Sequence, residues 1–392
     1  MRKNCIEALH IASFNGNIGD AANHNGFRTS LARETGRKVN YTNLEIREFY
    51  KSWGLRKFDE NFVKYANTFD LIIIGGGNFF ELAWDYSATG TTIDISDEIL
   101  AQINPPILFN CLGVDDGKGI SQSTRNKFGN FLHTITNSSK YIVTVRNDGS
   151  MQILQKYYDK EITDKIMKIP DGGFFVSPKE YHHPEIPENK RIIAVNIAGD
   201  MPEIRYTPQN SPSHISEEEF VEGFSSYVNT ILETEKDIHF VFVPHILKDY
   251  EIMSRVFRKI KDVYLRTMVS VAPCLNGTVT DGGYSIDLYK KSDLTLGMRY
   301  HSNICSIAVG TPTIGIVSYH KHRKLYEDIG LANRVVETNL KGFERRLFDK
   351  TQEALRNLQK MKRENEQIVH ELQTINKMYM MHVGKWLAEN HL

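Results

Sequence analysis

The chain has 392 residues, of which 41% are hydrophobic, and this is enough for two domains of ordinary size with separate cores. Lysine plus arginine and aspartate plus glutamate number 48 each, so no overall charge attracts nucleic acid, and a site for an anion must be built locally. The four cysteines are widely separated, and no segment has the apolar length of a secretory signal or a membrane span, so we expect reduced thiols in a cytoplasmic protein.

Strand-like apolar runs alternate with amphipathic segments in the first half of the chain, a pattern typical of α/β architecture. Strands are predicted at 6–14, 38–46, 71–74, 107–111 and 141–145, and helices at about 21–34 and 59–67. Each strand-like run ends in small or polar residues. Because ligands of parallel sheets bind at the carboxyl ends of strands, each of these ends is a candidate ligand face.

Two glycine-containing loops follow strands of this first series. Residues 17–20, Asn-Ile-Gly-Asp, join strand to helix without the spacing of a dinucleotide fingerprint or a P-loop, which disfavours nucleotide hydrolysis. The glycine lets backbone amides approach a ligand, and Asp20 is placed either to cap the helix or to accept a proton. Residues 75–78, Gly-Gly-Gly-Asn, would admit a sugar or another backbone at close range. A further strand end carries Arg146, for which a surface salt bridge is the alternative role.

A polar, proline-containing stretch at 177–190 has the composition of a linker. We therefore predict one domain at 1–180 and a second at 190–340. The second series of strands is predicted at 191–197, 237–243, near 263–266, 293–297 and 313–317. Residues 198–216, rich in proline, asparagine and serine, are either a surface loop or an active-site flap.

The run at 293–297 leads directly into Met-Arg-Tyr-His-Ser at 298–302, which places a cation and an imidazole at the carboxyl end of a strand. Ser302 is suited to cap the helix that follows, and Gly-Thr-Pro at 310–312 breaks that helix before the next strand. Arg299 and His301 would then offer an anionic ligand both a fixed charge and a helix N-terminus. The alternative is an arginine that caps a neighbouring helix and a histidine that is buried in the turn.

Several further polar residues could join Arg299 and His301. Asn196, His245 and Arg299 each follow a predicted strand of the second domain, and convergence from separate strands is more specific than any one residue. Arg205 and Lys321 are additional cations in the same half of the chain.

Residues 341–392 are helical in character, with apolar side chains spaced mostly by threes and fours. We expect a closing helical segment that packs back on the domains. The alternative is an interfacial helix that lies against lipid. The side chains that it would use are Met378, Tyr379, Met380, Met381 and Trp386.

Taken together, these segments resemble the polysaccharide pyruvyl transferase family. The resemblance rests, in chain order, on residues 17–20, 71–77, 145–150, 170–171, 299–302 and 310–312. It implies a glycosyltransferase-B-like α/β fold, in which two Rossmann-like domains face across a cleft, with the acceptor expected on the domain at 1–180 and the donor on the domain at 190–340. It also implies transfer of an enolpyruvyl-derived group from phosphoenolpyruvate to a sugar, usually as a cyclic ketal. Tyr300 stands where the family often has an aliphatic residue, and Asn147 where an acidic one is common, so the donor-pocket detail and the acceptor stay open.

The reaction implied by this resemblance can be matched to the candidate residues. Phosphoenolpyruvate carries a phosphate and a carboxylate, which guanidinium groups bind bidentately, so Arg299 is the main donor-binding candidate. His301 is the candidate acid that protonates the donor methylene, and Asp20 and His245 are alternatives for the base that acts on the acceptor hydroxyl. The remaining donor-binding candidates are Tyr300, Arg146, Arg205, Lys321 and Asn196. The acceptor-binding candidates are Asn17, Gly19, Gly76, Gly77 and Asn78.

The expected protein is a phosphoenolpyruvate-dependent ketal pyruvyltransferase that acts on a cell-surface polysaccharide, such as an exopolysaccharide or capsule, or on its precursor. Its expected partners are phosphoenolpyruvate and a sugar or lipid-linked oligosaccharide, with no metal, no further cofactor and no nucleic acid. Peripheral contact with the inner face of a membrane and the oligomeric state are left open. The alternatives are a sugar-nucleotide-dependent glycosyltransferase of the same fold and a polysaccharide-assembly protein without turnover.

Overall fold

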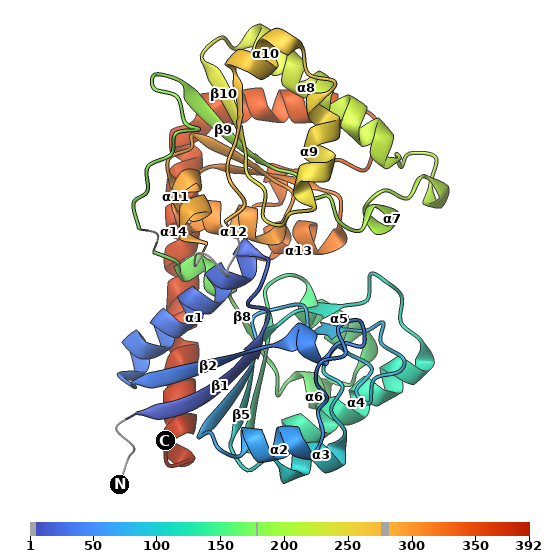
Figure 1. The fold of residues 1–392 in the computed structure, drawn as a ribbon, viewed down its shortest axis with the longest axis vertical. Coiled ribbons are helices and arrows are strands. Elements are labelled where there is room, and N and C mark those ends of the chain that lie inside the picture. The colour runs from blue at the N-terminus through green and yellow to red at the C-terminus, as the bar shows by residue number, and fades with distance from the viewer. Residues whose placement is uncertain (1–4, 178, 276–281) are drawn as a thin grey trace. The chain divides into compact units, whose positions relative to one another are not determined.

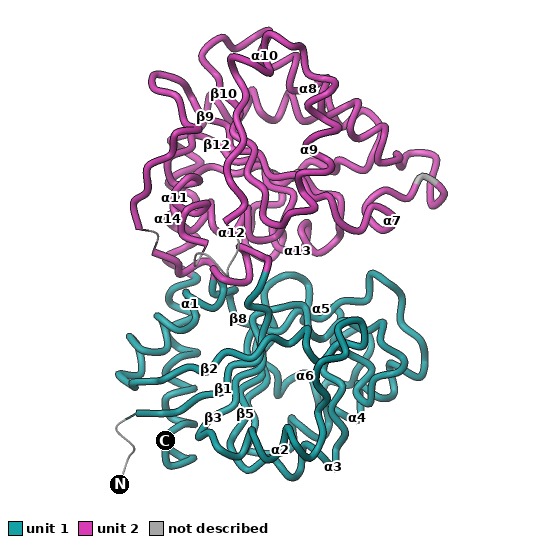
Figure 2. The backbone as a smooth tube through the Cα atoms, in the orientation of Figure 1, with its two compact units in different colours: residues 1–15, 23–172, 372–392 teal, residues 16–22, 173–371 magenta. Residues whose placement is uncertain are grey.

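Two six-stranded sheets, in which each paired strand runs parallel to its neighbour, organise the chain. The computed structural model describes residues 5–177, 179–275 and 282–392. Each sheet belongs to one of two compact units (Figures 1 and 2). Unit 1 contains residues 1–15, 23–172 and 372–392, and unit 2 contains residues 16–22 and 173–371.

The sheet of unit 1 has the strand order β2-β1-β3-β5-β7-β8. These strands are β1 (Ile6–Ala12), β2 (Val39–Glu45), β3 (Leu71–Gly75), β5 (Ile107–Leu112), β7 (Tyr141–Arg146) and β8 (Met167–Ile169), and a separate two-stranded ladder pairs β4 (Phe80–Glu81) with β6 (Val114–Asp115). The helices are α1 (Ile18–Thr35), whose first residues belong to unit 2, η1 (Ile46–Phe49), α2 (Glu60–Ala66), α3 (Asp97–Gln102), α4 (Gln122–Thr136), α5 (Ser150–Tyr157) and α6 (Lys160–Thr163). The next helix, η2 (Gly172–Phe175), belongs to unit 2 except for its first residue. Strand β3 is buried at every position, as expected for a parallel strand that is covered on both faces.

The sheet of unit 2 has the strand order β11-β10-β9-β12-β13-β14. These strands are β9 (Arg191–Asn196), β10 (Ile238–Phe242), β11 (Val269–Val271), β12 (Leu294–Gly297), β13 (Thr313–Val317) and β14 (Val335–Glu337). The helices are α7 (Pro202–Arg205), η3 (Pro208–Asn210), α8 (Glu217–Thr234), α9 (Asp249–Phe257), α10 (Asp262–Thr267), α11 (Gly283–Lys290), α12 (Tyr300–Ala308), α13 (His320–Asp328), η4 (Ala332–Arg334) and α14 (Phe343–Glu389). Counted in chain order the strands stand as 3-2-1-4-5-6, the Rossmann arrangement, and the order reverses between β9 and β12.

Most predicted strands form close to their expected positions, because long apolar runs are decisive for buried strands. The strand predicted near 263–266 is wrong: these residues belong to helix α10, and the edge strand β11 begins three residues later. Short apolar runs do not distinguish helix from strand. Here the i,i+4 ion pair between Asp262 and Arg266 supports the helix, and Val263 is exposed.

The boundary between the units also differs from the expected one. Residues 16–22, expected in the first domain, group with unit 2, and Ala22 packs in a core cluster of that unit with Ile192 and Ala194. The stretch expected to be a linker is held by unit 2: the Tyr181 amide donates to Asp287 Oδ2 (2.9 Å) on α11. Composition alone does not reveal such side-chain anchoring.

Helix α14 is 47 residues long and departs from helical dihedral angles at Asn357 (φ −122°, ψ 17°). Its first part supplies side chains such as Phe343 and Leu347 to the core of unit 2, and its last part packs in the core of unit 1. Tyr379, Met380 and Trp386 are buried there, so the lipid-facing role considered for these three is wrong. No helix within the described ranges has the length and apolar content needed to cross a membrane.

Candidate active site

The strand reversal in unit 2 brings two predicted site residues into contact. Asn196 ends β9 and is the register partner of Gly297 at the end of β12. The Arg299 amide donates to Asn196 Oδ1 (3.0 Å), and Asn196 Nδ2 donates to the carbonyl of Val243 beyond β10 (2.8 Å). Asn196 therefore ties together the carboxyl ends of three adjacent strands, at the switch point where ligands of such sheets bind.

The Arg299 guanidinium lies between two carboxylates. Its Nε donates to Asp249 Oδ2 (2.9 Å), and its Nη2 donates to Asp200 Oδ1 (3.0 Å). Burial by itself would lower the pKa of Arg299, but Asp249 and then Asp200 outweigh burial and raise the pKa above its usual value. The cation predicted at this strand end is thus present and permanently charged, with a side chain that is 12% exposed.

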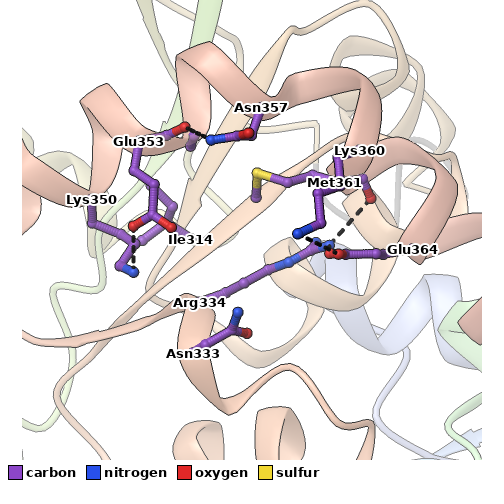
Figure 3. Close-up of a pocket in the computed structure, with 10 residues that line it drawn as sticks. Ile314, Asn333, Arg334, Lys350, Glu353, Asn357, Lys360, Met361 and Glu364 are labelled. Carbon is purple, nitrogen blue, oxygen red and sulfur yellow. Dashed lines mark hydrogen bonds and ion pairs between the residues drawn. The ribbon is translucent and has the colours of Figure 1, made fainter.

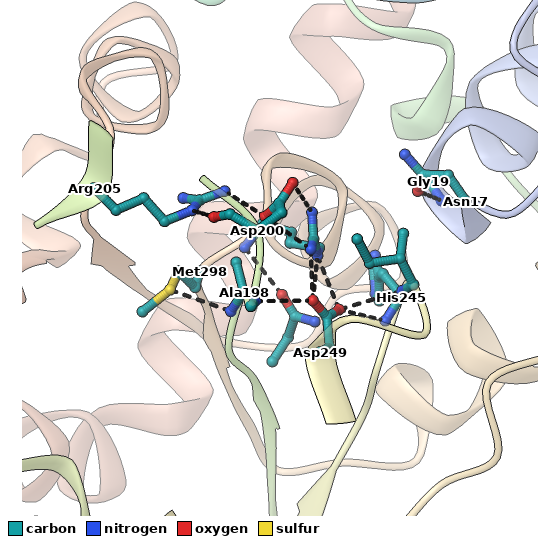
Figure 4. Close-up of polar contacts among 12 residues, drawn as sticks. Asn17, Gly19, Ala198, Asp200, Arg205, His245, Asp249 and Met298 are labelled. Carbon is teal, nitrogen blue, oxygen red and sulfur yellow. Dashed lines mark hydrogen bonds and ion pairs between the residues drawn. The ribbon is translucent and has the colours of Figure 1, made fainter. Parts of the chain in front are cut away.

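The two carboxylates are held differently. Asp249, the first residue of α9, is fully buried and accepts the amides of His245 (2.9 Å), Ile246 (3.2 Å) and Gly199 (3.2 Å) (Figure 4). The Asp200 side chain is 24% exposed and also pairs with Arg205 Nη2 (3.1 Å). Burial would raise the pKa of Asp200, but Arg299 and Arg205 outweigh it and lower the pKa to about 2.

Arg205 shows that residues 198–216 are more than a surface loop. Its side chain is buried on α7, where Nε donates to the carbonyl of Asp200 (2.8 Å) and Nη1 to Ser318 Oγ (3.3 Å). Ser318 directly follows β13, so a fourth strand end contributes to the cluster. Lys321, the remaining predicted cation, is buried in the first turn of α13.

His245 is a buried, neutral imidazole. Its Nε2 lies 2.6 Å from the Tyr289 hydroxyl on α11. Burial lowers the pKa of His245 to about 3, although the Asp249 carboxylate opposes the shift. At neutral pH this side chain therefore holds no positive charge and has one ring nitrogen that can accept a hydrogen bond.

His301 lies in the first turn of α12 and packs against the first turn of α1. A Cβ added to Gly19 would lie only 2.4 Å from His301 Nδ1, so only glycine leaves room for this ring. The amide of Ile18 donates to the carbonyl of His245 (3.3 Å). Residues from three distant parts of the sequence thus meet in unit 2, and Asn17 and Gly19, expected on the acceptor domain, lie on the same unit as Arg299.

Two predicted helix caps are corrected by these turns. The Asn17 side-chain oxygen accepts the Gly19 amide (3.0 Å; Figure 4), so Asn17 has the capping role considered for Asp20, which lies within the first turn of α1. Arg299 is the N-cap residue of α12, and Ser302 lies inside the helix, where its hydroxyl donates to the Arg299 carbonyl (2.7 Å). Tyr300 opens α12, with its ring centroid 5.3 Å from that of His301.

Replacing Gly19 by alanine is expected to lower turnover by about 10-fold to 100-fold, because the added Cβ must displace the His301 ring. Steady-state kinetics of the purified variant, with circular dichroism to confirm folding, measure this effect. Gly129→Ala on α4 is the matched control, since its Cβ would lie 3.2 Å from the Tyr158 ring. Turnover equal to that of the native chain would mean that contact with Gly19 does not position His301.

Four predicted site residues lie in unit 1. Gly76, with a φ of 87°, and Gly77 follow β3, and a Cβ on Gly76 would meet the side chains of Asn23 and His24. Asn78 Nδ2 donates to Asp115 Oδ2 (2.9 Å). Arg146 is not a surface residue: it is buried at the end of β7 and pairs with Asp148 (2.7 Å) and Asp171 (3.8 Å).

Sequence reasoning missed Asp200, Asp249 and Tyr289, which complete the cluster in unit 2. Asp200 and Asp249 follow β9 and β10 within a few residues, so acidic side chains at strand ends were the available signal. In the sequence Asp249 looks like an ordinary helix residue. Its pairing with Arg299 could not be predicted, because the two residues are 50 positions apart.

Unit 2 also has a separate hollow of about 100 Å³ beside the irregular turn at Asn357 (Figure 3). Arg334 crosses it and donates to Asn365 Oδ1 (2.6 Å) and Glu364 Oε2 (2.6 Å). These bonds tie η4 to α14, so the hollow supports the helix contact and we assign it no donor-binding role.

Comparison with known proteins agrees with this geometry. The family model described as polysaccharide pyruvyl transferase matches residues 17–320, a range that includes the convergent loops of unit 2. Comparison with proteins of curated function returned no match.

Solved structures support the fold. A glycosyltransferase from Rickettsia africae is 13% identical, with a TM-score of 0.56, and the likeness covers 99% of this chain and 98% of that one. A putative UDP-N-acetylglucosamine 2-epimerase from Listeria monocytogenes is 12% identical, with a TM-score of 0.53, over 93% of this chain and 91% of that one. The UDP-GlcNAc 2-epimerase from Neisseria meningitidis is 11% identical, with a TM-score of 0.52, over 94% of this chain and 100% of that one.

At such low identity these likenesses show the fold alone, and they confirm the predicted class: α/β with two Rossmann-like domains of the glycosyltransferase-B type. The family match spans well over half of the chain and includes both the loop at 17–20 and the Arg299–His301 turn. By this match the chain belongs to the polysaccharide pyruvyl transferase family.

Proposed function

We propose that this transferase moves an enolpyruvyl-derived group from phosphoenolpyruvate to a sugar of a polysaccharide or its precursor and leaves a pyruvate ketal. The observation that supports the proposal is the cluster in unit 2. Arg299 and Arg205 share the carboxylate of Asp200 at the switch point of the sheet, beside the His301 turn. A carboxylate bound between two guanidinium groups is the arrangement that an anionic donor requires.

Asp200 would be the group that the donor displaces. Asp249 is fully buried and bound by three backbone amides, so its pairing with Arg299 is permanent. Asp200 has a partly exposed side chain and is bound mainly by the two arginines. The carboxylate or phosphate of phosphoenolpyruvate would therefore replace Asp200, while Asp249 keeps Arg299 in place.

The proposed chemistry accounts for each proton. His301 would donate a proton to the donor methylene, which becomes the ketal methyl group, and the positive charge develops at the carbon that carries the phosphate. One sugar hydroxyl attacks this carbon, and a second replaces the phosphate. The two hydroxyls together release two protons: one restores His301 and the other leaves with phosphate. Asp20 is the candidate that first takes up these protons, whereas His245, with its pKa lowered to about 3, would be a poor base for this step.

The test is mass spectrometry of sugar acceptors incubated with the protein and phosphoenolpyruvate, together with a phosphate-release assay. We expect one acceptor class, such as a galactoside or mannoside, to gain the mass of a pyruvate ketal as one phosphate is released. Transfer from a sugar nucleotide with no reaction of phosphoenolpyruvate would instead identify a glycosyltransferase and reject the proposal.

Replacing Arg299 by lysine is expected to lower kcat/KM strongly, because an ammonium group cannot hold Asp249 and also bind bidentately the donor that replaces Asp200. The expected loss is about 2–4 kcal/mol of transition-state stabilisation. Kinetics with phosphoenolpyruvate measure it, and Arg258→Lys, at an exposed position after α9, is the matched control. Unchanged kinetics would remove Arg299 from the donor site.

A further inference from the structure

A hollow on unit 1, whose lining includes none of the residues assigned above, is lined by aromatic rings and cations. Its volume is about 530 Å³, within the range of about 300–1,000 Å³ that is usual for ligand sites. The lining residues that matter here are Tyr50, Lys51, Arg56, Lys57, Tyr86 and Asp94. A second hollow of about 330 Å³ shares part of this lining and extends it to Tyr65. We call the two together the aromatic hollow.

The loop that forms one wall of the aromatic hollow is held in place. The Arg56 amide donates to the Glu48 carbonyl (2.8 Å), which closes the loop. Phe49 and Phe58 anchor its two ends by stacking at a centroid distance of 4.0 Å. The Trp84 ring packs against the lining residue Tyr50, with the two ring centroids 5.1 Å apart. Rings held in this way lose little conformational entropy when a ligand binds.

The same loops expose an unusual share of apolar surface. Trp53 is 46% exposed, Leu55 67%, Tyr65 40% and Tyr86 50%. Leu55, Tyr65 and Tyr86 line the aromatic hollow, and Trp53 belongs to the same loop as Leu55. Such a group differs from the scattered exposed residues of an ordinary surface and marks a binding site. Aromatic rings of this kind offer flat apolar faces with a polar edge.

The charges of the aromatic hollow favour an anionic ligand. Lys51, Arg56 and Lys57 line it together with two carboxylates that are engaged by backbone amides: Asp59 caps α2, and Asp94 accepts the Ala88 amide (2.7 Å). Arg56 is paired with Glu48, so Lys51 and Lys57 supply the positive charge that a ligand can use. Lys51 Nζ lies 5.4 Å from the Tyr86 ring centroid. Within residues 5–177, 179–275 and 282–392, no carboxylate pairs with Lys57.

We infer that the aromatic hollow binds a stretch of acidic oligosaccharide. Sugar rings have apolar faces of C–H groups that pack flat on aromatic rings, and their carboxylates would reach Lys57 and Lys51. The inference rests on the proposed function in one respect: a polymer that carries pyruvate ketals gains one carboxylate at each. The hollow would thus hold a polymer segment next to the one that reacts, as an accessory site for the acceptor chain.

The test is a binding titration of the full chain with hexagalacturonate and, in parallel, with an uncharged maltohexaose and a hexaglutamate peptide. Isothermal calorimetry without phosphoenolpyruvate reports binding alone. We expect hexagalacturonate to bind most tightly, with an affinity that falls as salt is raised because the charges are exposed. Tyr86→Ala and Lys57→Ala should each weaken binding by about three- to tenfold, and their combination by more.

Two controls separate the ring and the charge from general damage. Tyr86→Phe keeps the ring and should keep most of the affinity, and Lys385→Ala removes an exposed cation at the end of α14 and should change nothing. Equal affinity of the native chain and the Tyr86→Ala, Lys57→Ala double variant overturns the inference, as does tighter binding of hexaglutamate, which would indicate a protein partner. Ketal formation on a monosaccharide should be unchanged in the double variant, so loss of this site and failure of the proposed function give different results.

Discussion

Replacing His301 by glutamine is expected to lower turnover by about 10²-fold to 10⁴-fold, the usual effect of losing a general acid. The amide can still donate a hydrogen bond, so much of the donor affinity should remain. The position supports this role, because His301 lies two residues after Arg299 and against the Gly19 turn. Single-turnover kinetics measure the chemical step, and titration of phosphoenolpyruvate measures donor binding separately.

Solvent deuterium gives an independent readout of the same substitution. If His301 delivers the proton, the native chain should place deuterium from solvent in the ketal methyl group, and the His301→Gln variant should do so only at its residual rate. His133→Gln, at an exposed position on α4, is the matched control and should behave as the native chain does.

The rival view is that His301 only binds phosphate. In that case donor affinity should fall in step with turnover, and the chemical step of the bound complex should be preserved. A variant with native single-turnover chemistry would remove His301 from the proton transfer.

The second large effect is expected for Asp249. Substitution by alanine should lower the free energy of unfolding by about 3–5 kcal/mol, because among the described residues it leaves the largely buried Arg299 guanidinium with Asp200 as its remaining carboxylate partner. It also removes the acceptor of three backbone amides, those of Gly199, His245 and Ile246. Denaturant unfolding of the variant and the native chain measures this loss of stability, provided that the two proteins have the same m-value.

Graded variants separate charge from hydrogen bonding at this position. Asp249→Asn keeps one acceptor oxygen without the charge and should be less damaging than Asp249→Ala. Asp262→Ala removes a carboxylate from an exposed ion pair with Arg266 and should cost less than about 1 kcal/mol. If Asp249→Ala lowers the free energy of unfolding by no more than this control does, Asp249 does not hold Arg299 in solution.

Loss of activity in Asp249→Asn without loss of stability would carry separate information. It would mean that the carboxylate orients Arg299 for the donor although the fold tolerates its removal. The expected signature is a rise in the KM for phosphoenolpyruvate that is larger than the fall in kcat, because Asp249 touches the arginine and is separated from the reacting atoms.

Local sequence patterns determined the strands, the α/β class and the turn that carries Arg299 and His301. Each of these depends on residues close together in the chain: an apolar run makes a buried strand, and a break after it exposes the strand end. The strand predicted at 263–266 was wrong because it too relied on local pattern alone. A run of three or four apolar residues suits an edge strand and a helix equally well. The capping roles predicted for Ser302 and Asp20 were wrong, because Arg299 and Asn17 occupy the N-cap positions of the two helices.

The tertiary structure alone decided what surrounds these residues. Arg299 is held by Asp249 and Asp200, which lie 50 and 99 residues away in the sequence and meet it because β10, β9 and β12 are adjacent in the sheet. The loop at 16–22 joins unit 2 because Ala22 packs in its core and Gly19 leaves space for His301. Such contacts depend on strand order and on the packing of distant segments, and neither is encoded in the spacing of neighbouring residues.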